Sequence, residues 1–407
     1  MHEFWIGLSV LGALAAWWVL RRPIARAAST QPTPAAGRPT PEPTPTGAAR
    51  LAQAVGEAAA ADAAAVAAAR AAMETQPASS AASAFELPEL PVLPVQPVLP
   101  AAEARPLPPA LQGFTLREAN TLPLERLHWT LERLREIPRP PRALHNLTSL
   151  EFVAQASSAD LADLVMSEPL VAAKVMARVH SPAYGLQQTA GTIGQAITFI
   201  GTTSVRNICM RYLLEASFQA DNPHIRKIFD ALGDASTLAS ELCLQLSNRI
   251  RLPDAASLMT KVLLSYTGHL AATMLQVGLR NGASRSHSVP LLQRTYGQQQ
   301  ELGLPGNGIG LMLMREWRLP EELAVDVASI DRVLVTPVEQ MPPETAPQLA
   351  LGYLCARLAD RITAGQIVGT GSFETLLESD PDFHHLHGYL ALPALAGLRE
   401  ALAAPGH

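Results

Sequence analysis

The sequence predicts an all-α fold, and two observations lead to it. Downstream of Leu122, apolar residues recur three and four positions apart, which is the spacing of one face of a helix. No stretch there sustains the alternation of apolar and polar residues that a half-buried strand requires. We therefore expect a helical domain over residues 122–335 and a helical extension over residues 336–407.

The N-terminal segment, residues 1–26, is expected to anchor the chain in a membrane. An uncharged apolar run begins at Phe4 and ends at Leu20, just long enough to cross a bilayer core of about 30 Å as a helix. Arginines follow the run at once, whereas its N-terminal flank holds only His2 and Glu3 besides Met1. The positive-inside rule then places the N-terminus outside and the rest of the chain in the cytoplasm. The alternative, a cleaved signal peptide, lacks the basic residues that should precede the apolar run.

Residues 27–121 are expected to form a disordered linker. Thr-Pro repeats and the later sequence LPELPVLPVQPVLP favour extended, solvated backbone. The Ala-rich stretch between them offers few large apolar side chains to bury. We interpret this segment as a spacer, with a docking site for a proline-recognition domain as the alternative.

Residues 167–201 carry the clearest helix signals of the chain. Pro169 suits the first turn of a helix, and Pro182 disfavours helical backbone at the residue before it. The buried face of this first helix is predicted to hold Val171, Val175 and Val179. The inward face of a second helix is predicted to hold Ile193, Ala196, Ile197 and Ile200, and Gly201 is placed to end it in a left-handed cap.

Helical patterns cover most of the rest of the domain. They span residues 124–134, 160–166, 202–218, 225–247, 255–277, 288–302, 308–329, 345–363 and 390–402. A stretch rich in glycine at residues 303–310 separates two of these patterns, and we expect a turn there.

Composition limits the classes of function. The net charge of −5 argues against a broad nucleic-acid surface. Six basic residues in the middle of the domain are interpreted as a solvated helical face: Arg206, Arg211, Arg226, Lys227, Arg249 and Arg251. The cysteines Cys209, Cys243 and Cys355 are isolated, which suggests buried thiols in a reducing compartment.

The order of these signals resembles the HDOD family, the HD-related output domain of bacterial signalling proteins. The residues that carry the resemblance are Glu168, Pro169, His180, Ser181, Tyr184, Gly185, Ala196, Ile197, Gly201, Trp317 and Pro320. His180 departs from the family, which usually has Asn there. The resemblance implies a helical bundle related to the HD phosphohydrolases, acting as a protein-interaction or ligand-sensing module.

The resemblance also implies where the related hydrolases bind metal. In those enzymes an adjacent His-Asp pair holds a divalent ion that activates water. The matching pair here is Ser265 and Tyr266, a weak neutral ligand and a phenol that stays protonated near neutral pH. The remaining ligand positions fall near Ala235, Gly306 and Asp331, and none is a histidine. We expect no metal, no cofactor and no catalytic residue.

Two groups of histidines lie outside those positions. His269 is a single imidazole, for which we expect a structural or surface role. The histidines of a C-terminal loop, His384, His385 and His387, lie close to Asp380 and Asp382 in sequence. Whether this cluster binds metal stays open, with a purposeful site the less favoured interpretation.

The sequence thus predicts a non-catalytic signal-transduction or protein-interaction module tethered to the bacterial inner membrane. A protein partner is expected, a nucleotide ligand stays open, and nucleic acid is not favoured. We expect binding in a groove between two helical halves. Two alternatives remain, a metal-dependent phosphohydrolase with a rebuilt site and a purely structural membrane tether.

Overall fold

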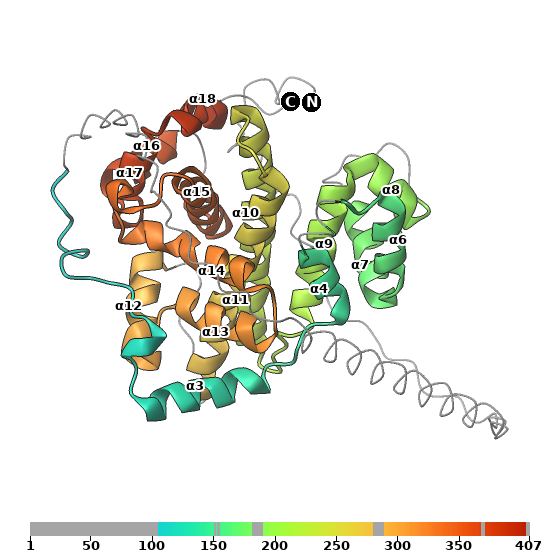
Figure 1. Ribbon diagram of the computed structural model, residues 1–407, viewed down its shortest axis with the longest axis horizontal. Coiled ribbons are helices and arrows are strands. Elements are labelled where there is room, and N and C mark those ends of the chain that lie inside the picture. The colour runs from blue at the N-terminus through green and yellow to red at the C-terminus, as the bar shows by residue number, and fades with distance from the viewer. Residues whose placement is uncertain are drawn as a thin grey trace, which may run out of the picture. The chain divides into compact units, whose positions relative to one another are not determined.

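Every regular element in the described part of the chain is a helix (Figure 1). A computed structural model describes residues 105–149, 152, 155–180, 190–279, 289–367 and 371–403. The predicted anchor from Phe4 to Leu20 lies outside the described residues, and so do Ser181, Tyr184 and Gly185. The all-α prediction is confirmed for the part of the chain that is described.

The helices divide at the long helix α10. Before it lie η1 (Ala119–Thr121), α3 (Leu124–Glu136), α4 (Arg142–Thr148), α6 (Ser158–Met166), α7 (Pro169–Val179), α8 (Ile193–Ile200) and α9 (Thr202–Glu215). From α10 on they are α10 (Pro223–Ile250), α11 (Ala255–Leu279), α12 (Leu291–Leu302), α13 (Gly306–Glu316), α14 (Glu321–Ser329), η3 (Ile330–Leu334), η4 (Val338–Gln340), α15 (Ala346–Thr363), α16 (Gly371–Ser379), η5 (Pro381–Phe383), α17 (Leu386–Tyr389), η6 (Pro393–Leu395) and α18 (Leu398–Ala403).

Helices α10 and α11 form the centre of the packing. They lie along each other, α15 packs on both, and α13 crosses α11. Among the described residues, α11 alone has the length and mean hydropathy of a membrane span, yet 78% of that window is buried among other helices. Val262, Leu264 and Ala271 are fully buried. An apolar helix that is covered on all sides is typical of a protein core.

The predicted helix pair within residues 167–201 is present as α7 and α8. Helix α7 begins at Pro169, with Glu168 at the N-cap but without a side-chain hydrogen bond there, and ends at Val179. The predicted inward residues of α8 are buried at Ile193, Ala196 and Ile197. These helices pack with α6 and α9.

Gly201 joins α8 to α9. Its φ of +85° confirms the positive φ that was predicted, but its ψ of 152° lies outside the left-handed helical region. The chain therefore turns from one helix directly into the next, with Gly201 as the N-cap of α9. A residue with a Cβ is strained at this φ, which is why glycine suits the joint.

The break predicted at residues 303–310 is confirmed only over residues 303–305, where Gly303 ends α12 with a φ of +85°. Over the rest of that stretch the prediction is wrong, because α13 begins at Gly306 and runs through Gly310. Glycine is tolerated there because the backbone of α13 approaches α11 closely. A Cβ on Gly310 would lie 2.8 Å from the Gly268 Cα, and one on Gly268 only 2.2 Å from the Gly306 carbonyl oxygen. Here glycine serves helix packing and does not mark a turn.

A second difference concerns the pattern over residues 308–329, which is divided between α13 and α14. The break falls at Arg318, whose φ is +59°, and Pro320 then takes the N-cap of α14.

At the C-terminus, the predicted helix over residues 390–402 is reduced to η6 and α18. At the other end, Leu111 is buried upstream of the predicted domain start at Leu122.

Candidate functional site

The positions that match the hydrolase ligands converge in the fold. Ser265 and Tyr266 lie on buried turns of α11, one helical turn before His269. A Cβ on Gly306 would lie 2.5 Å from His269 Nδ1, and His269 Nε2 lies 3.2 Å from Asp331 Oδ2. The fold therefore brings three of the four positions around His269.

Ser265 and Tyr266 are both engaged within the protein. The Ser265 hydroxyl donates to the Val262 carbonyl of its own helix at 2.8 Å. The Tyr266 hydroxyl lies 2.9 Å from the Ala356 carbonyl oxygen and 3.1 Å from Asp360 Oδ1, both on α15. Burial and the Asp360 charge raise the pKa of the Tyr266 phenol far above its ordinary value, so it stays neutral.

Around these residues lies a buried ionic cluster, defined here as His269, Arg294, Asp331, Arg357 and Asp360. Arg294 Nη2 lies 2.8 Å from Asp360 Oδ2. Arg357 lies between the two carboxylates, with Nη1 3.5 Å from Asp360 Oδ2 and Nη2 3.7 Å from Asp331 Oδ1. Helices α11, α12 and α15 and the short helix η3 all contribute to this cluster.

The electrostatics of the cluster favour ionised carboxylates and a neutral imidazole. Burial alone would raise the pKa of Asp331, but Arg357, His269 and Arg294 together hold it at about 2. The pKa of Asp360 is also lowered, because the charges of Arg294 and Arg357 outweigh the effect of its burial. Burial and the charge of Arg294 lower the pKa of His269, whereas Asp331 raises it by less.

A second buried group of charges continues from the cluster along α15. Arg361 Nη2 lies 2.5 Å from Asp380 Oδ2 and 2.8 Å from Asp382 Oδ2. The Asp382 carboxylate also accepts the backbone N–H groups of Leu291 and Leu292 at 2.7 and 2.8 Å. A residue from η5 thus caps the N-terminus of α12, where unpaired N–H groups and the helix dipole favour a negative charge.

The hydrolases that the sequence resembles would hold a divalent ion at the matching positions, and the residues present here do not fit one. The Ser265 and Tyr266 hydroxyls are neutral and bonded elsewhere, while the Asp331 and Asp360 carboxylates face guanidinium groups. Among the described residues, no group of three or more His, Cys, Asp or Glu side chains is arranged to hold a metal ion. Charge compensation here comes from arginine.

The C-terminal histidines do not gather around their neighbouring acids. His384 and His385 stack edge to face with ring centroids 5.0 Å apart. Asp380 and Asp382 instead form ion pairs with Arg361 of α15. The metal interpretation of this loop therefore gains no support from the placement of its carboxylates.

The residues of the predicted family motifs have structural roles where they are described. His180 Nε2 lies 2.7 Å from the Ala190 carbonyl oxygen, which ties the end of α7 to the entrance of α8. Trp317 is buried at the end of α13 and packs its ring 5.8 Å from Phe218. Of the basic residues predicted to be solvated, Arg206 is buried and donates to the Ala256 carbonyl of α11.

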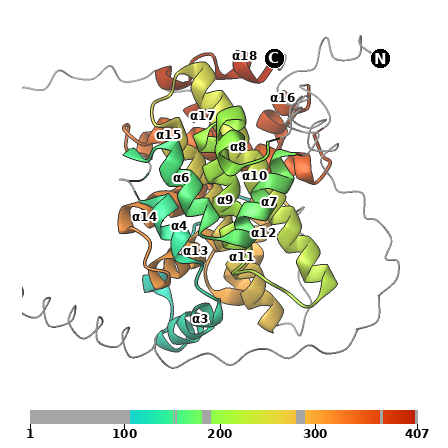
Figure 2. The same cartoon turned by 90° about the vertical axis from the view of Figure 1, so that its right-hand side faces the viewer.

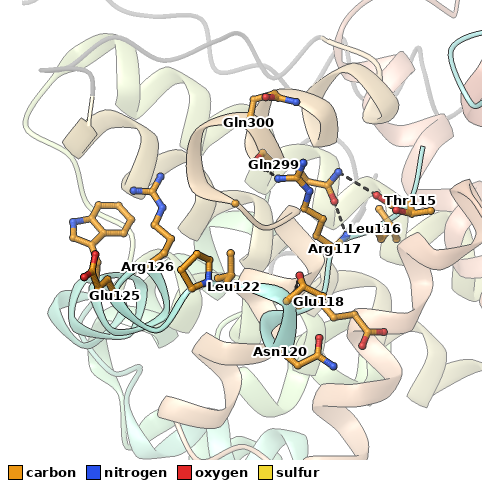
Figure 3. A pocket seen from close by; sticks show the side chains of 14 residues that line it. Thr115, Leu116, Arg117, Glu118, Asn120, Leu122, Glu125, Arg126, Gln299 and Gln300 are labelled. Carbon is orange, nitrogen blue, oxygen red and sulfur yellow. Dashed lines mark hydrogen bonds between the residues drawn. The ribbon is translucent and has the colours of Figure 1, made fainter. Parts of the chain in front are cut away.

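A surface cavity of about 1020 Å³ lies between the segment that precedes α3 and the end of α12 (Figure 3). The Gln299 side chain amide holds this segment, accepting from the Arg117 N–H at 2.7 Å and donating to the Thr115 carbonyl at 3.1 Å. Arg126 covers the Trp129 ring at 4.8 Å. No residue of the buried ionic cluster lines this cavity.

A smaller cavity of about 30 Å³ lies among α9, α10 and α11, next to Tyr266 and Ser236. It has room for one or two water molecules. Arg211 of α9 reaches across to α10, where it donates to Thr237 Oγ1 at 3.1 Å. Gly233 leaves room for it, because a Cβ there would lie 2.6 Å from Arg211 Cζ.

Sequence reasoning missed Arg294, Arg357 and Asp360. Arg294 and Asp331 lie more than twenty residues from their partners Asp360 and Arg357, so no local spacing connects those pairs. Arg357 and Asp360 are close in sequence, three positions apart. One signal was available: Arg357, Asp360 and Arg361 are three and four positions apart in an otherwise largely apolar segment. Charges on one stripe of an apolar helix indicate buried ion pairs.

Comparison with known proteins identifies one family. The model of the HDOD domain matches residues 137–333. A solved HDOD domain protein with unknown function from Geobacter sulfurreducens is 14% identical, with a TM-score of 0.47, over 68% of this chain and 93% of that chain. A protein from Shewanella amazonensis, named only provisionally as a phosphohydrolase, is 16% identical with a TM-score of 0.38, over 64% and 98%. No curated protein matches the chain.

Proposed function

Because residues 137–333 of this chain form an HDOD domain, we propose that the protein is a non-catalytic signalling module that acts by binding a partner protein. It works at the bacterial inner membrane, to which its N-terminal apolar run tethers it. The observation that carries the proposal is the replacement of the ligand pair by Ser265 and Tyr266, beside carboxylates already neutralised by arginine.

The rival function is a metal-dependent phosphohydrolase with a rebuilt site. One observation favours it, since His269 and Asp331 form a His-Asp pair in space, 3.2 Å apart. Against it, Arg357 faces Asp331 from the other side, and His269 is only 2% exposed. A hydrolase needs a metal-bound water that reaches its substrate.

Metal analysis and hydrolysis assays separate the two functions. The untagged full chain should carry no stoichiometric divalent metal and should not turn over nucleotides or phosphodiesters. The Asp331→Asn variant is the matched control, because turnover that this variant loses would locate a working site at His269 and Asp331. Bound metal with such turnover would overturn the proposal.

The space beside Tyr266 is too small for a nucleotide, and the surface cavity of about 1020 Å³ is lined by none of the residues of the buried ionic cluster. The cavity between α9 and the α10–α11 pair holds about 30 Å³, far below the volume that a nucleotide site needs. A protein can instead dock on the outer helices without entering the core.

Crosslinking in the native cell tests for the partner. The full chain as bait should recover a specific protein that residues 1–121 alone, which contain the anchor and the linker, do not recover. Equal recovery by both baits would favour the structural tether. Recovery of no specific protein would contradict the interaction proposal.

Membrane tethering rests on the run from Phe4 to Leu20 and the arginines that follow it. The full chain should sediment with inner membranes and resist extraction by carbonate. A chain that lacks this run should move to the soluble fraction and still recover the partner. Retention of the deleted chain in the membrane would contradict the proposed anchor.

A further inference from the structure

The outer face of α12 lies under a part of the chain that precedes the family match. Residues 105–123, here called the strap, come before α3, and residues 114–118 within the strap form no helix. In Figure 1 the strap runs along the side of the domain away from α6 to α9, the helices that face the viewer in Figure 2. Helix α12 packs on α11 and η5, and the strap crosses the face that carries Tyr296 and Gln299. This helix face is therefore covered by a segment without regular structure.

The side chain of Gln299 binds the backbone of the strap at two points. Its Oε1 accepts the Arg117 N–H at 2.7 Å, and its Nε2 donates to the Thr115 carbonyl at 3.1 Å (Figure 3). Gln299 is only 5% exposed, so the protein holds this amide in place. An amide that pairs with an N–H and a carbonyl two residues apart recognises backbone and not a side chain. Another extended segment can therefore form the same two hydrogen bonds.

The side chains of the strap add contacts at the surface. The Phe114 ring lies 6.4 Å from that of Tyr296, which is 54% exposed. Arg117 Nη1 donates to a backbone carbonyl of α12 at 3.3 Å. Glu118 pairs with Arg332 at 3.1 Å, and both side chains are more than half exposed, so this ion pair contributes little to stability. The contacts define a sequence preference that can be exchanged at small cost.

Residues 114–118 are fixed at both ends. Leu111 is 3% exposed, and Leu122 lies against Gly303. Gly113 has a φ of +71°, which glycine adopts without strain, and no described atom lies within 4 Å of its Cβ position. The cavity of about 1020 Å³ adjoins the strap at the end of α12. The segment can therefore open as a loop, with room beside it for a second segment.

We propose that this face of α12 is the groove in which the partner protein docks an extended segment, and that residues 114–118 occupy the groove until the partner displaces them. The partner's segment carries an aromatic side chain, an arginine three residues later and an acid directly after the arginine. The inference rests on the proposed function, because it names where the partner binds. It adds regulation, since the groove accepts the partner only when the strap has opened.

Hydrogen exchange on the wild-type full chain in detergent tests whether the strap opens. Amides of residues 114–118 should exchange at least about a hundredfold faster than those of α11, because local opening takes less free energy than global unfolding. Equal protection of the two regions would show that the strap belongs permanently to the core, and it would overturn the inference.

A peptide supplied in trans tests the groove. The probe is a labelled peptide with the sequence of residues 111–120, LQGFTLREAN. The full-chain variant Arg117→Pro lacks the N–H that Gln299 accepts. It should bind the probe at least about tenfold more tightly than the wild type, whose own strap competes at a high effective concentration. Phe114→Ala, which loses the ring contact with Tyr296, replaces this variant if it does not fold.

Two controls tie binding to the amide of Gln299. Addition of Gln299→Ala to the Arg117→Pro chain should remove the gain in affinity. A probe with proline in place of its arginine should bind no variant, because it lacks the N–H. Probe binding that survives either control, or no gain in affinity on opening the strap, would overturn the inference. A wild type that dimerises by exchange of straps would assign the groove to a second copy and would also overturn it.

Crosslinking in the cell connects the groove to the partner. Arg117→Pro should raise recovery of the partner several-fold, and Gln299→Ala should lower it. Equal recovery by both variants would contradict the groove alone, since a partner is still bound. The peptide assay contains no partner, so probe binding without recovery of any protein in the cell would contradict the proposed function.

Discussion

At the scale of residues, Asp360 joins more of the structure than any local pattern in the sequence indicates. Its carboxylate contacts the Tyr266 hydroxyl of α11, Arg294 of α12 and Arg357 of its own helix. A buried carboxylate of this kind stabilises the fold only while its cations are present, and they in turn depend on it.

Replacement of Asp360 by Asn should lower the free energy of unfolding by about 3–5 kcal/mol, because it leaves buried guanidinium charge without compensation. The matched control is Asp326→Asn, which removes the acid of a pair with Lys261 whose Asp side chain is 43% exposed. The control should cost less than about 1 kcal/mol. Urea unfolding at neutral pH measures both, and similar small losses would contradict the role given to Asp360.

His269 predicts a pH dependence with a definite sign. Its pKa in the folded protein is lowered, mainly by burial and by Arg294, so protonation favours the unfolded chain. The stability it contributes is complete above the unfolded pKa of about 6.5 and is lost as the pH falls below it. Asp331, with a pKa of about 2, adds a separate loss below about pH 4.

The variant His269→Gln isolates the first of these two losses. The free energy of unfolding of the wild type should decrease between pH 7 and pH 5 more steeply than that of the variant. His224→Gln, at an exposed position, should keep the wild-type slope. Parallel curves for all three proteins would show that His269 does not titrate in this way.

At the scale of elements, the crossing of α11 and α13 is set by glycines. A Cβ on Gly268 would meet the Gly306 carbonyl oxygen at 2.2 Å, and this backbone atom cannot move aside cheaply. Gly278, in the same helix, has no atom within 4 Å of its Cβ position. Substitution of Gly268 therefore tests the packing between the helices, whereas substitution of Gly278 tests helix propensity alone.

Gly268→Ala should lower the melting temperature by several degrees, since overpacking of this kind costs about 1–3 kcal/mol or more. Gly278→Ala should raise the free energy of unfolding by up to about 1 kcal/mol, because alanine is the better helix former. Thermal unfolding followed by circular dichroism compares them. A stabilising Gly268→Ala would contradict the close crossing.

Some features of the helices could be predicted from the sequence and others could not. The faces of α7 and α8 follow from spacing alone, because helical periodicity is a local property. Gly306 was predicted to lie in a turn, because glycine occurs both in turns and at close helix crossings, and only the position of the partner helix distinguishes the two. The HDOD family was recognised from the order of weak motifs, and the family-model match to residues 137–333 confirms it. The buried ionic cluster was not predicted, because its five residues come from four helices that are far apart in the sequence.

At the scale of the whole molecule, the helices beyond the family match belong to the core. The match ends at residue 333, yet Arg357 and Asp360 of α15 complete the cluster around Tyr266 and Asp331. Tyr353, also on α15, is fully buried and donates to the Asp382 carbonyl at 2.7 Å.

A chain that stops at residue 345 should therefore fail to fold cooperatively. It leaves Asp331 without its cation and exposes the faces of α10 and α11 that α15 covers. A chain that begins at residue 105 keeps every contact described and should unfold in one transition. Near-ultraviolet circular dichroism and urea unfolding distinguish them, and cooperative unfolding of the first chain would contradict the role of α15.

The cap that Asp382 gives to α12 has a consequence for synthesis. The helix begins at Leu291, but the acid that receives its first N–H groups follows about ninety residues later. A ribosome that has just released α12 has not yet made its cap, so this helix can reach its final form only when translation is nearly finished. Interruption of the reading frame anywhere between the two should leave a nascent product that chaperones recognise as incomplete.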